Sequence, residues 1–183
     1  SLPKYDIDVS DVKISEVMYG GADREWIELF NNNSQGVNIS TGSIYNYETS
    51  TTIDLPDSAV LDPYGTYVLG DTGLLFPDHK VDITLENNGA VLAFRDRHGE
   101  DIDVISWGDG SSSFGYGVAN GWKTNSNATA NLPENSSIFR YNLTRKFLSD
   151  TNSSDDWYNT TNPTPGAFYE IRSGDILFSE ISM

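Results

Sequence analysis

One short stretch, Glu25-Trp26-Ile27-Glu28-Leu29-Phe30-Asn31, gives the clearest indication of the fold. In a β-strand, successive side chains point to opposite faces. Ile27, Leu29 and Asn31 would therefore share one face, which is suited to a core. Trp26, Glu28 and Phe30 would share the other, which combines aromatic rings with a carboxylate. We predict a strand here.

The rest of the chain repeats this pattern. Short runs of β-branched and aromatic residues are bounded by turn residues, and helical periodicity is hard to find. This is typical of an all-β sandwich or barrel. The predicted strands are 12–19, 25–31, 42–47, 51–55, 65–70, 80–85, 90–95, 101–107 and 137–141. Asn87-Asn88-Gly89 and Arg97-His98-Gly99 supply tight turns, so the strands on either side of them are predicted to form a meander.

The opening phrase of the first predicted strand recurs near the end of the chain. Asp11-Val12-Lys13-Ile14-Ser15-Glu16-Val17-Met18 is echoed 164 residues later by Asp175-Ile176-Leu177-Phe178-Ser179-Glu180-Ile181-Ser182. Repeats of fixed period mark tandem arrays. We therefore expect a leader or linker over 1–10, one module over 11–170, and a linker with the first strand of a following repeat over 171–183.

That last strand would lack a domain of its own. We expect it to be disordered or to add to a sheet edge, which would allow strand-exchange self-association through 175–183.

The composition suits one folded domain with an acidic surface. The 183 residues are 37% hydrophobic and 12% aromatic but only 21% charged, which is too apolar a balance for a disordered chain. The formal net charge is −16, and the 11 Lys and Arg residues form no cluster. Because nucleic-acid binding depends on basic residues, we expect no nucleic-acid partner. No apolar run approaches the ~20 residues of a membrane span, so these residues are not expected to insert into a membrane.

The sequence lacks the usual signs of catalysis. It contains no cysteine, which excludes thiol chemistry and cysteine zinc sites. Asp71-Thr72-Gly73 resembles half of an aspartic-protease site, but Gly70 interrupts the strand that should precede it, and a turn explains the tripeptide more simply. His79 and His98 have no metal-binding partners nearby in the sequence and are interpreted as turn residues. We therefore predict no catalytic residues, no enzyme activity and no cofactor.

Clustered acidic residues leave calcium as an alternative. Asp155 and Asp156 are weak candidate ligands, because calcium prefers several carboxylate oxygens, but no EF-hand spacing is present. Glu16 and Glu28 have a different interpretation, as partly buried, hydrogen-bonded carboxylates that fix strand pairing.

Aromatic residues suggest a second binding chemistry. Flat rings stack on sugar rings, which makes Trp107, Trp122 and Trp157 candidate carbohydrate-binding residues; the alternative is packing in the core and in loops. Trp122 lies in a Gly-, Ser- and Asn-rich span, 108–135, that is longer than ordinary connections. We interpret this span as either a functional loop or a tolerated insertion.

Glycosylation sequons suggest where the protein is found. The pattern Asn-x-Ser/Thr occurs at Asn32 and Asn38, and again within one polar stretch at Asn127, Asn135, Asn142, Asn152 and Asn159. Chance would give roughly three such sites. The excess favours an exported protein that carries N-linked glycans, and hence an extracellular or cell-surface location.

Six phrases in order resemble the lamin-tail domain in its prokaryotic form. They are 14–19, 25–31, 61–69, 85–92, 103–108 and 162–167. Their order and spacing match from about residue 11 to residue 168. The resemblance implies an immunoglobulin-like antiparallel β-sandwich closed by Pro163-Thr164-Pro165-Gly166. Asp155-Asp156-Trp157 resembles the tryptophan-bearing strand that relatives have at this place. The family's structural motif residues here would be Glu16, Trp26, Glu28, Asn31, Pro165 and Gly166.

The resemblance also carries functional expectations. Prokaryotic members of that family are commonly appendages of exported multidomain proteins, and no catalytic residues are assigned to the domain. By this resemblance the chain would be the first module of a tandem array, acting as a non-catalytic spacer, adhesion or protein-interaction element. Its partners would be surface proteins or envelope polysaccharide. The alternative is a carbohydrate-binding module that targets an attached enzyme to a polymer.

Overall fold

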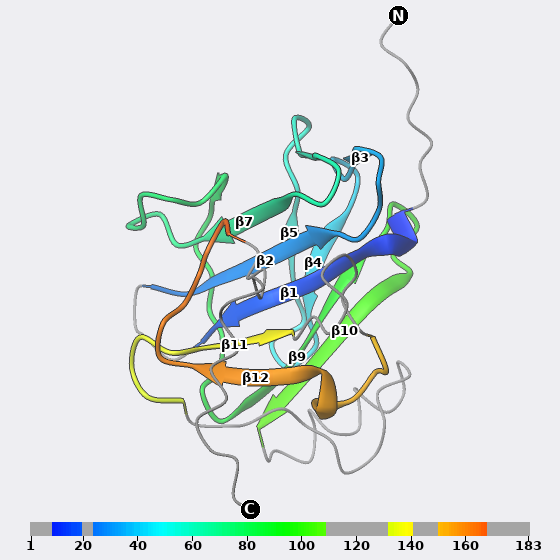
Figure 1. Ribbon diagram of the computed structural model, residues 1–183. Helices are drawn as coiled ribbons and strands as arrows, with labels where there is room; N and C mark the ends of the chain where they lie inside the picture. The colour runs from blue at the N-terminus through cyan, green and yellow to red at the C-terminus, as the bar shows by residue number, and fades with distance from the viewer. Residues whose placement is uncertain (1–8, 20–23, 109–131, 141–149, 168–183) are drawn as a thin grey trace, which may run out of the picture.

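The computed structural model describes residues 9–19, 24–108, 132–140 and 150–167. Regular structure in these ranges is almost entirely β-strand, with short 3-10 helices at η1 (Val9–Asp11) and η2 (Ser154–Asp156). Figure 1 shows the strands arranged as two layers, a six-stranded sheet and a four-stranded sheet. The prediction of an all-β antiparallel sandwich is confirmed.

The six-stranded sheet contains both the first and the last described strands. Its order is β12 (Trp157–Thr160), β11 (Ser137–Arg140), β1 (Val12–Met18), β2 (Trp26–Asn31), β7 (Thr66–Gly70) and β8 (His79–Lys80). Neighbouring strands are antiparallel except for the parallel pair of β7 and β8. Trp157 lies in a strand, β12, as the family resemblance implied, but Asp155 and Asp156 belong to η2, the 3-10 helix before it.

The four-stranded sheet has the order β10 (Asp101–Gly108), β9 (Gly89–Arg95), β4 (Ser43–Asn46) and β5 (Thr51–Asp54). A separate two-stranded pair joins β3 (Val37–Asn38) to β6 (Val60–Leu61). This short pair was not predicted, because two-residue strands leave no alternation in the sequence.

The core fills the space between the two large sheets. Ile27 and Leu29 of β2 are fully buried against apolar residues of the four-stranded sheet such as Leu92. At one end, Tyr19 stacks on Trp107 of β10 with ring centroids 4.6 Å apart. The face of β2 predicted to be apolar is therefore the core face.

A β-bulge in β1 decides which residues face the core. The pairing with β2 shifts between Ile14 and Glu16, which leaves Ser15 as the extra residue. Because a bulge inserts one residue, the alternation changes phase there. Ile14 points into the core before the bulge, and Val17 does so after it. Glu16 is thereby placed on the outer face of the sheet.

The predicted strand 80–85 is wrong beyond Lys80, and so is the meander that depended on it. Residues 81–86 form no strand. Their backbone N–H groups instead bond outside a ladder, as with Val81 N to Gly70 O at 3.0 Å and Leu85 N to Glu25 Oε2 at 2.7 Å. The hairpin of β9 and β10 is present.

Among the described residues, none of the helices has the length and apolar character needed to span a membrane.

Candidate functional site

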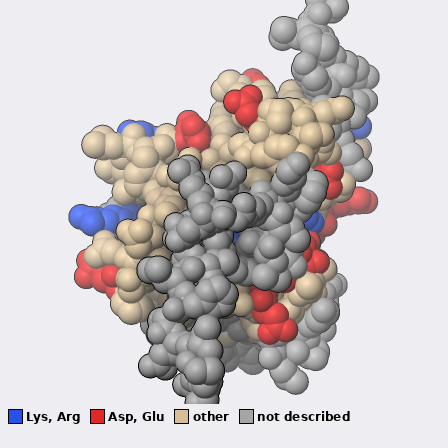
Figure 2. Space-filling model, viewed as in Figure 1, with Lys and Arg blue, Asp and Glu red and all other residues tan. Residues whose placement is uncertain are grey.

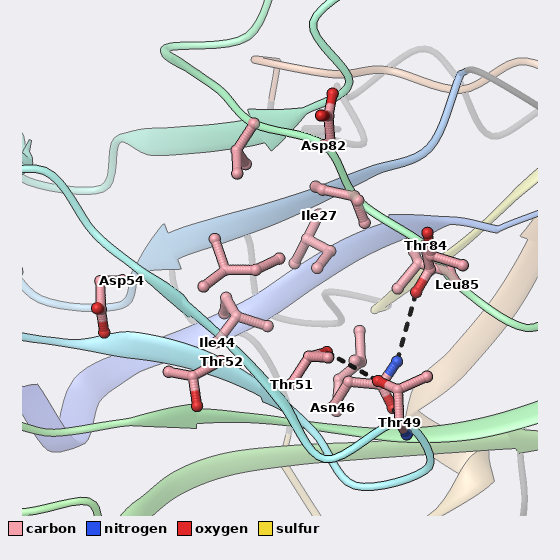
Figure 3. Close-up of a pocket in the computed structure, with 14 residues that line it drawn as sticks. Ile27, Ile44, Asn46, Thr49, Thr51, Thr52, Asp54, Asp82, Thr84 and Leu85 are labelled. Atoms are coloured by element: carbon pink, nitrogen blue, oxygen red, sulfur yellow. Dashed lines mark hydrogen bonds between the residues drawn. The ribbon is translucent and has the colours of Figure 1, made fainter.

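A groove opens where the two large sheets end on the same side. β5 is the last strand of the four-stranded sheet, and β8, followed by residues 81–85, ends the six-stranded sheet. Between them lies a cavity of about 500 Å³ (Figure 3).

The floor of the groove is apolar, and its rim is polar. Ile27, Ile44 and Leu92 form the floor and are almost completely buried. Threonines dominate the rim, and the only charged residues among the lining set are Asp54 and Asp82. Figure 3 shows Ile27 and Ile44 between Asp54, on the β5 side, and Asp82, on the opposite wall. The groove therefore suits an apolar group flanked by polar or basic ones.

Carboxylates hold the wall formed by residues 81–85 in place. Asp71 accepts hydrogen bonds from Glu25 N at 2.7 Å and from Ile83 N at 3.1 Å. The Asn46 side chain donates to Thr84 O at 3.4 Å, which ties the wall to β4 (Figure 3). Asp71 is buried and organises backbone, which gives it a structural task. The backbone bond from Leu74 N to Asp71 O at 3.0 Å marks the turn that the sequence predicted.

The edge strand β5 is the most open regular element beside the groove. In the described part of the chain it pairs only with β4, from Ser43 opposite Asp54 to Asn46 opposite Thr51. Three of its four residues are exposed, and Ile53 is half-buried against the core. An unpaired strand edge presents backbone N–H and C=O groups to which an extended chain can hydrogen-bond.

On the outer face of the six-stranded sheet, Glu16 and Glu28 form a pair of buried carboxylates. They lie opposite each other on β1 and β2, and each is at most 2% exposed. Ser137 Oγ donates to Glu16, and Ser15 Oγ donates to Glu28 Oε1 at 2.6 Å.

The closing Pro-Thr-Pro-Gly segment covers this pair. Thr164 bonds Glu16 through its backbone N–H, at 3.2 and 3.3 Å, and through its hydroxyl, at 2.9 Å. Gly166 N donates to Glu28 Oε2 at 2.8 Å, with Gly166 at a φ of 76° that favours glycine. Pro163 and Pro165 flank these contacts. The two glutamates therefore attach the segment 163–166 to the six-stranded sheet.

Burial dominates the electrostatics of the pair. It raises the pKa of Glu28 to about 7, against hydrogen bonds from Ser15 and Gly166 that lower it, and the neighbouring Glu16 raises it further. Burial likewise raises the pKa of Glu16, opposed by the bonds from Ser137 and Thr164. The two carboxyl groups therefore hold their protons more tightly than exposed glutamates do. Their role is to attach the segment 163–166 to the sheet.

A second buried cluster surrounds Arg140 on β11. Its guanidinium is fully buried, bonds both oxygens of Asp103 at 2.8 and 2.9 Å, and bonds Asp150 at 3.0 Å. It also lies over the ring of Trp157, 4.8 Å from the centroid. The Asp103 carboxylate accepts from Ile14 N at 2.7 Å, which joins this cluster to β1. The cluster therefore has a structural role.

The candidate calcium ligands lie in different environments. Asp156 is buried and accepts two hydrogen bonds from Thr151, while Asp155 is exposed to solvent. Among the described residues, no group of three or more His, Cys, Asp or Glu side chains is placed to hold a metal ion.

The proposed sugar platform has to be corrected. Trp107 is 0% exposed, and its indole N–H donates to Glu86 O at 2.8 Å; Trp157 is 7% exposed and packs on Arg140. Neither ring offers a face to a sugar, because each is used in packing. Trp122, together with most of 108–135, lies outside the described residues.

The candidate glycosylation sites fall partly within the described ranges. Asn135 is exposed in a turn, where its side chain accepts from Arg24 at 3.2 Å. Asn159 is exposed on β12, and Asn152 is half-buried in a turn. Asn127 and Asn142 lie outside the described residues.

The remaining motif residues are structural. Asn31 is fully buried and donates to Gln35 O and Asp62 O at 2.7 and 2.9 Å, which fixes the loop after β2. Trp26 packs with Met18 and Val68 on the outer face of the sheet. His98 is exposed in a turn, and His79 lies in β8.

The sequence did not predict the groove, because its lining residues come from several separate stretches of sequence.

Comparisons with known proteins identify the family of the chain. No curated protein sequence matches the chain. The sequence model of one family, the Lamin Tail Domain, matches residues 7–109, more than half of the chain. That match covers β1 to β10 and the segments between them, and so every residue of the groove, and this family has an immunoglobulin-like, typically non-enzymatic fold. The chain belongs to the Lamin Tail Domain family.

Proposed function

We propose that this domain is a non-catalytic interaction and spacer module of an exported, cell-surface multidomain protein. Its binding surface is the edge of β5 together with the adjoining groove. The observation that carries the proposal is that β5, within the residues that the structure describes, pairs on one side only, directly beside an apolar cavity of about 500 Å³. An extended segment of a partner protein would add to β5 as a further strand and place alternate side chains in the groove.

The geometry supports strand addition over a role in chemistry. The titratable groups with the strongest burial, such as Glu28 and Asp103, are used to hold segments of the fold together. The groove itself has an aliphatic floor and a threonine-rich rim. None of the described residues that line it is aromatic, which disfavours sugar stacking as its mode of binding.

Selection of peptides by the intact chain tests the site. Nine-residue peptides selected from a displayed random library would be added to the protein, and backbone hydrogen exchange would be followed residue by residue. We expect slower exchange at 51–54 and a proline-interrupted version of the same peptide to lose binding, because proline cannot donate to a ladder. Protection confined to other surfaces would refute the proposed site.

The most instructive competing surface is a shallow hollow on the outer face of the six-stranded sheet. It has a volume of about 460 Å³ and includes Trp26, Phe76 and Pro165. Leu75, which also lines it, is 93% exposed. Protection of this hollow instead of β5 would move the binding site there.

Export is supported by the sequons and is tested separately. Intact mass and peptide mapping of the protein from its native host would show whether Asn135, Asn152 and Asn159 carry glycans. Because both Asn135 and Asn159 are exposed, we expect at least one of them to be modified. Bare asparagines at every sequon would remove the main support for a cell-surface location.

A further inference from the structure

We propose that the groove beside β5 selects extended peptides in which aliphatic residues alternate with basic ones. This inference rests on the proposed function and adds the chemistry of the partner to it. It follows from three properties of the groove, namely its apolar floor, its acidic rim and its open strand edge.

The floor selects aliphatic side chains. Residues i and i+2 of a strand lie on the same face, about 7 Å apart, so a strand added to β5 would direct one row of side chains into the groove. That row would meet Ile44 and Ile53, which lie opposite each other on β4 and β5, and Ile27 across the groove. Cavities of about 300–1,000 Å³ commonly hold apolar ligand groups, and this cavity falls within that range.

The rim selects basic side chains. Asp54 and Asp82 are exposed, and the lining residues within the described ranges include no lysine or arginine. Asp82 Oδ1 accepts from the Thr72 hydroxyl at 3.2 Å, which orients its carboxylate at the rim. A net charge of −16 adds long-range attraction for a cationic partner. Figure 2 shows acidic side chains at several places on the surface that it presents, with few basic ones.

Charge also argues against the chain's own C-terminal run as the occupant. Residues 175–183 contain Asp175 and Glu180 and no basic residue. Bringing them to the groove would place like charges near Asp54 and Asp82, which weakens association. A second copy of the chain meets the same difficulty, because it also carries 16 net negative charges.

Three fluorescein-labelled nine-residue peptides test the inference with the intact chain. The first alternates lysine with valine, the second replaces each lysine by serine, and the third has the sequence of residues 175–183. Fluorescence anisotropy would give each Kd at low salt. We expect the lysine peptide to bind about tenfold more tightly than the serine peptide, because its lysines can form ion pairs with both carboxylates of the rim.

Matched variants assign the effect to the rim. The double variant Asp54→Asn/Asp82→Asn should reduce the preference for lysine over serine to about twofold or less. The control Asp155→Asn also removes an exposed carboxylate, but on the 3-10 helix that precedes β12, the strand at the far end of the sheet from β8. It should leave the preference unchanged. Hydrogen exchange at 51–54 confirms that the peptides occupy β5.

The outcomes separate this inference from the proposed function. Equal binding of the lysine and serine peptides, with protection of 51–54, would overturn the charge selection and leave strand addition in place. Tightest binding by the 175–183 peptide would overturn the inference in favour of self-association. If Asp155→Asn and the double variant lost the preference for lysine over serine equally, the inference would also be overturned. The overall negative charge of the protein would then explain the preference without the rim. A lack of protection at 51–54 with all three peptides would refute the proposed function as well.

Discussion

Replacing Glu28 with glutamine should make the domain more stable at neutral and alkaline pH. Glu28 is 1% exposed, lies opposite Glu16, and has its pKa raised from 4.5 to about 7 in the fold, mainly by burial. A carboxyl group with a raised folded pKa stabilises the fold fully below the unfolded value of 4.5. That contribution is lost as the pH rises through about 7. Wild-type stability from this group therefore falls between about pH 4.5 and pH 8.

The size of the effect follows from the shift in pKa. Each pKa unit corresponds to about 1.4 kcal/mol, so the full change from pH 4 to pH 8 is about 3 kcal/mol for Glu28 alone. Glutamine fits the same bonds. Its oxygen can accept from Gly166 N, while its amide donates to the Ser15 hydroxyl, which in the wild type donates to Glu28 O and Oε1. The variant should therefore match the wild type in acid and exceed it by about 2–3 kcal/mol at pH 8.

Urea unfolding of both proteins from pH 4 to pH 8 measures the difference directly. Glu100→Gln is the matched control, because Glu100 is exposed and its removal changes the net charge equally. A difference in the free energy of unfolding between wild type and Glu28→Gln that stays constant with pH would refute the raised pKa. So would a gap that Glu100→Gln reproduces, since general charge repulsion would then explain it.

Three further substitutions test the structural clusters. Arg140→Met should lower the free energy of unfolding by about 3–5 kcal/mol, because it leaves the fully buried Asp103 without its partner; adding Asp103→Asn should recover part of the loss, as denaturant unfolding would show. Gly108→Ala should cost about 2–4 kcal/mol, because Gly108 has a φ of 87° and its new Cβ would lie 2.2 Å from Gly89 Cα; Gly99→Ala, with a φ of 78° and open space around it, should cost only about 1 kcal/mol in the same thermal melts. Asp71→Asn should loosen the groove wall, which would appear as faster hydrogen exchange at Ile83 with little change in the amides of β10.

Alternation predicted the strands well where one face meets the core. In β2, Ile27 and Leu29 face the core as expected, because long-range packing and local pattern agree there. The same reasoning failed at 81–85. Val81, Ile83 and Leu85 alternate like a strand and do turn apolar side chains inward. Val81 N still bonds to Gly70 O at the end of β7, but the N–H groups of Ile83 and Leu85 bond to the side chains of Asp71 and Glu25 and continue no ladder. Side-chain periodicity carries no information about which acceptor a backbone group finds.

The candidate site was less accessible to prediction than the fold. Its floor combines Ile27, Ile44 and Leu92, which are far apart in the sequence. The sequence pattern around each of them indicates a buried residue but gives no sign of a shared groove. The visible candidates, Trp107 and Trp157, were attractive because aromatic rings bind sugars, yet large rings are also the best core residues. Tyr19 and Arg140, which cover their faces, lie on other strands, and no local pattern in the sequence pairs them with these rings.

The acidic composition has a structural cause as well as a role at the surface. Several carboxylates accept hydrogen bonds from backbone N–H groups, and most of them do so where an irregular segment meets a sheet: Glu16, Glu25, Glu28, Asp71, Asp78, Asp103 and Asp156. In these places a carboxylate oxygen supplies the acceptor that a backbone carbonyl of a neighbouring strand supplies within a ladder. A buried N–H group needs such an acceptor.

This division gives the charges of the domain different consequences. A carboxylate that accepts backbone bonds holds the connections and the closing segment, so removing one should change stability more than binding. Asp54 and Asp82 accept no backbone N–H bond in the described structure, and they stand at the rim of the groove. Their removal should therefore change binding with little effect on the free energy of unfolding. That contrast distinguishes the acidic residues that build the domain from those that select its partner.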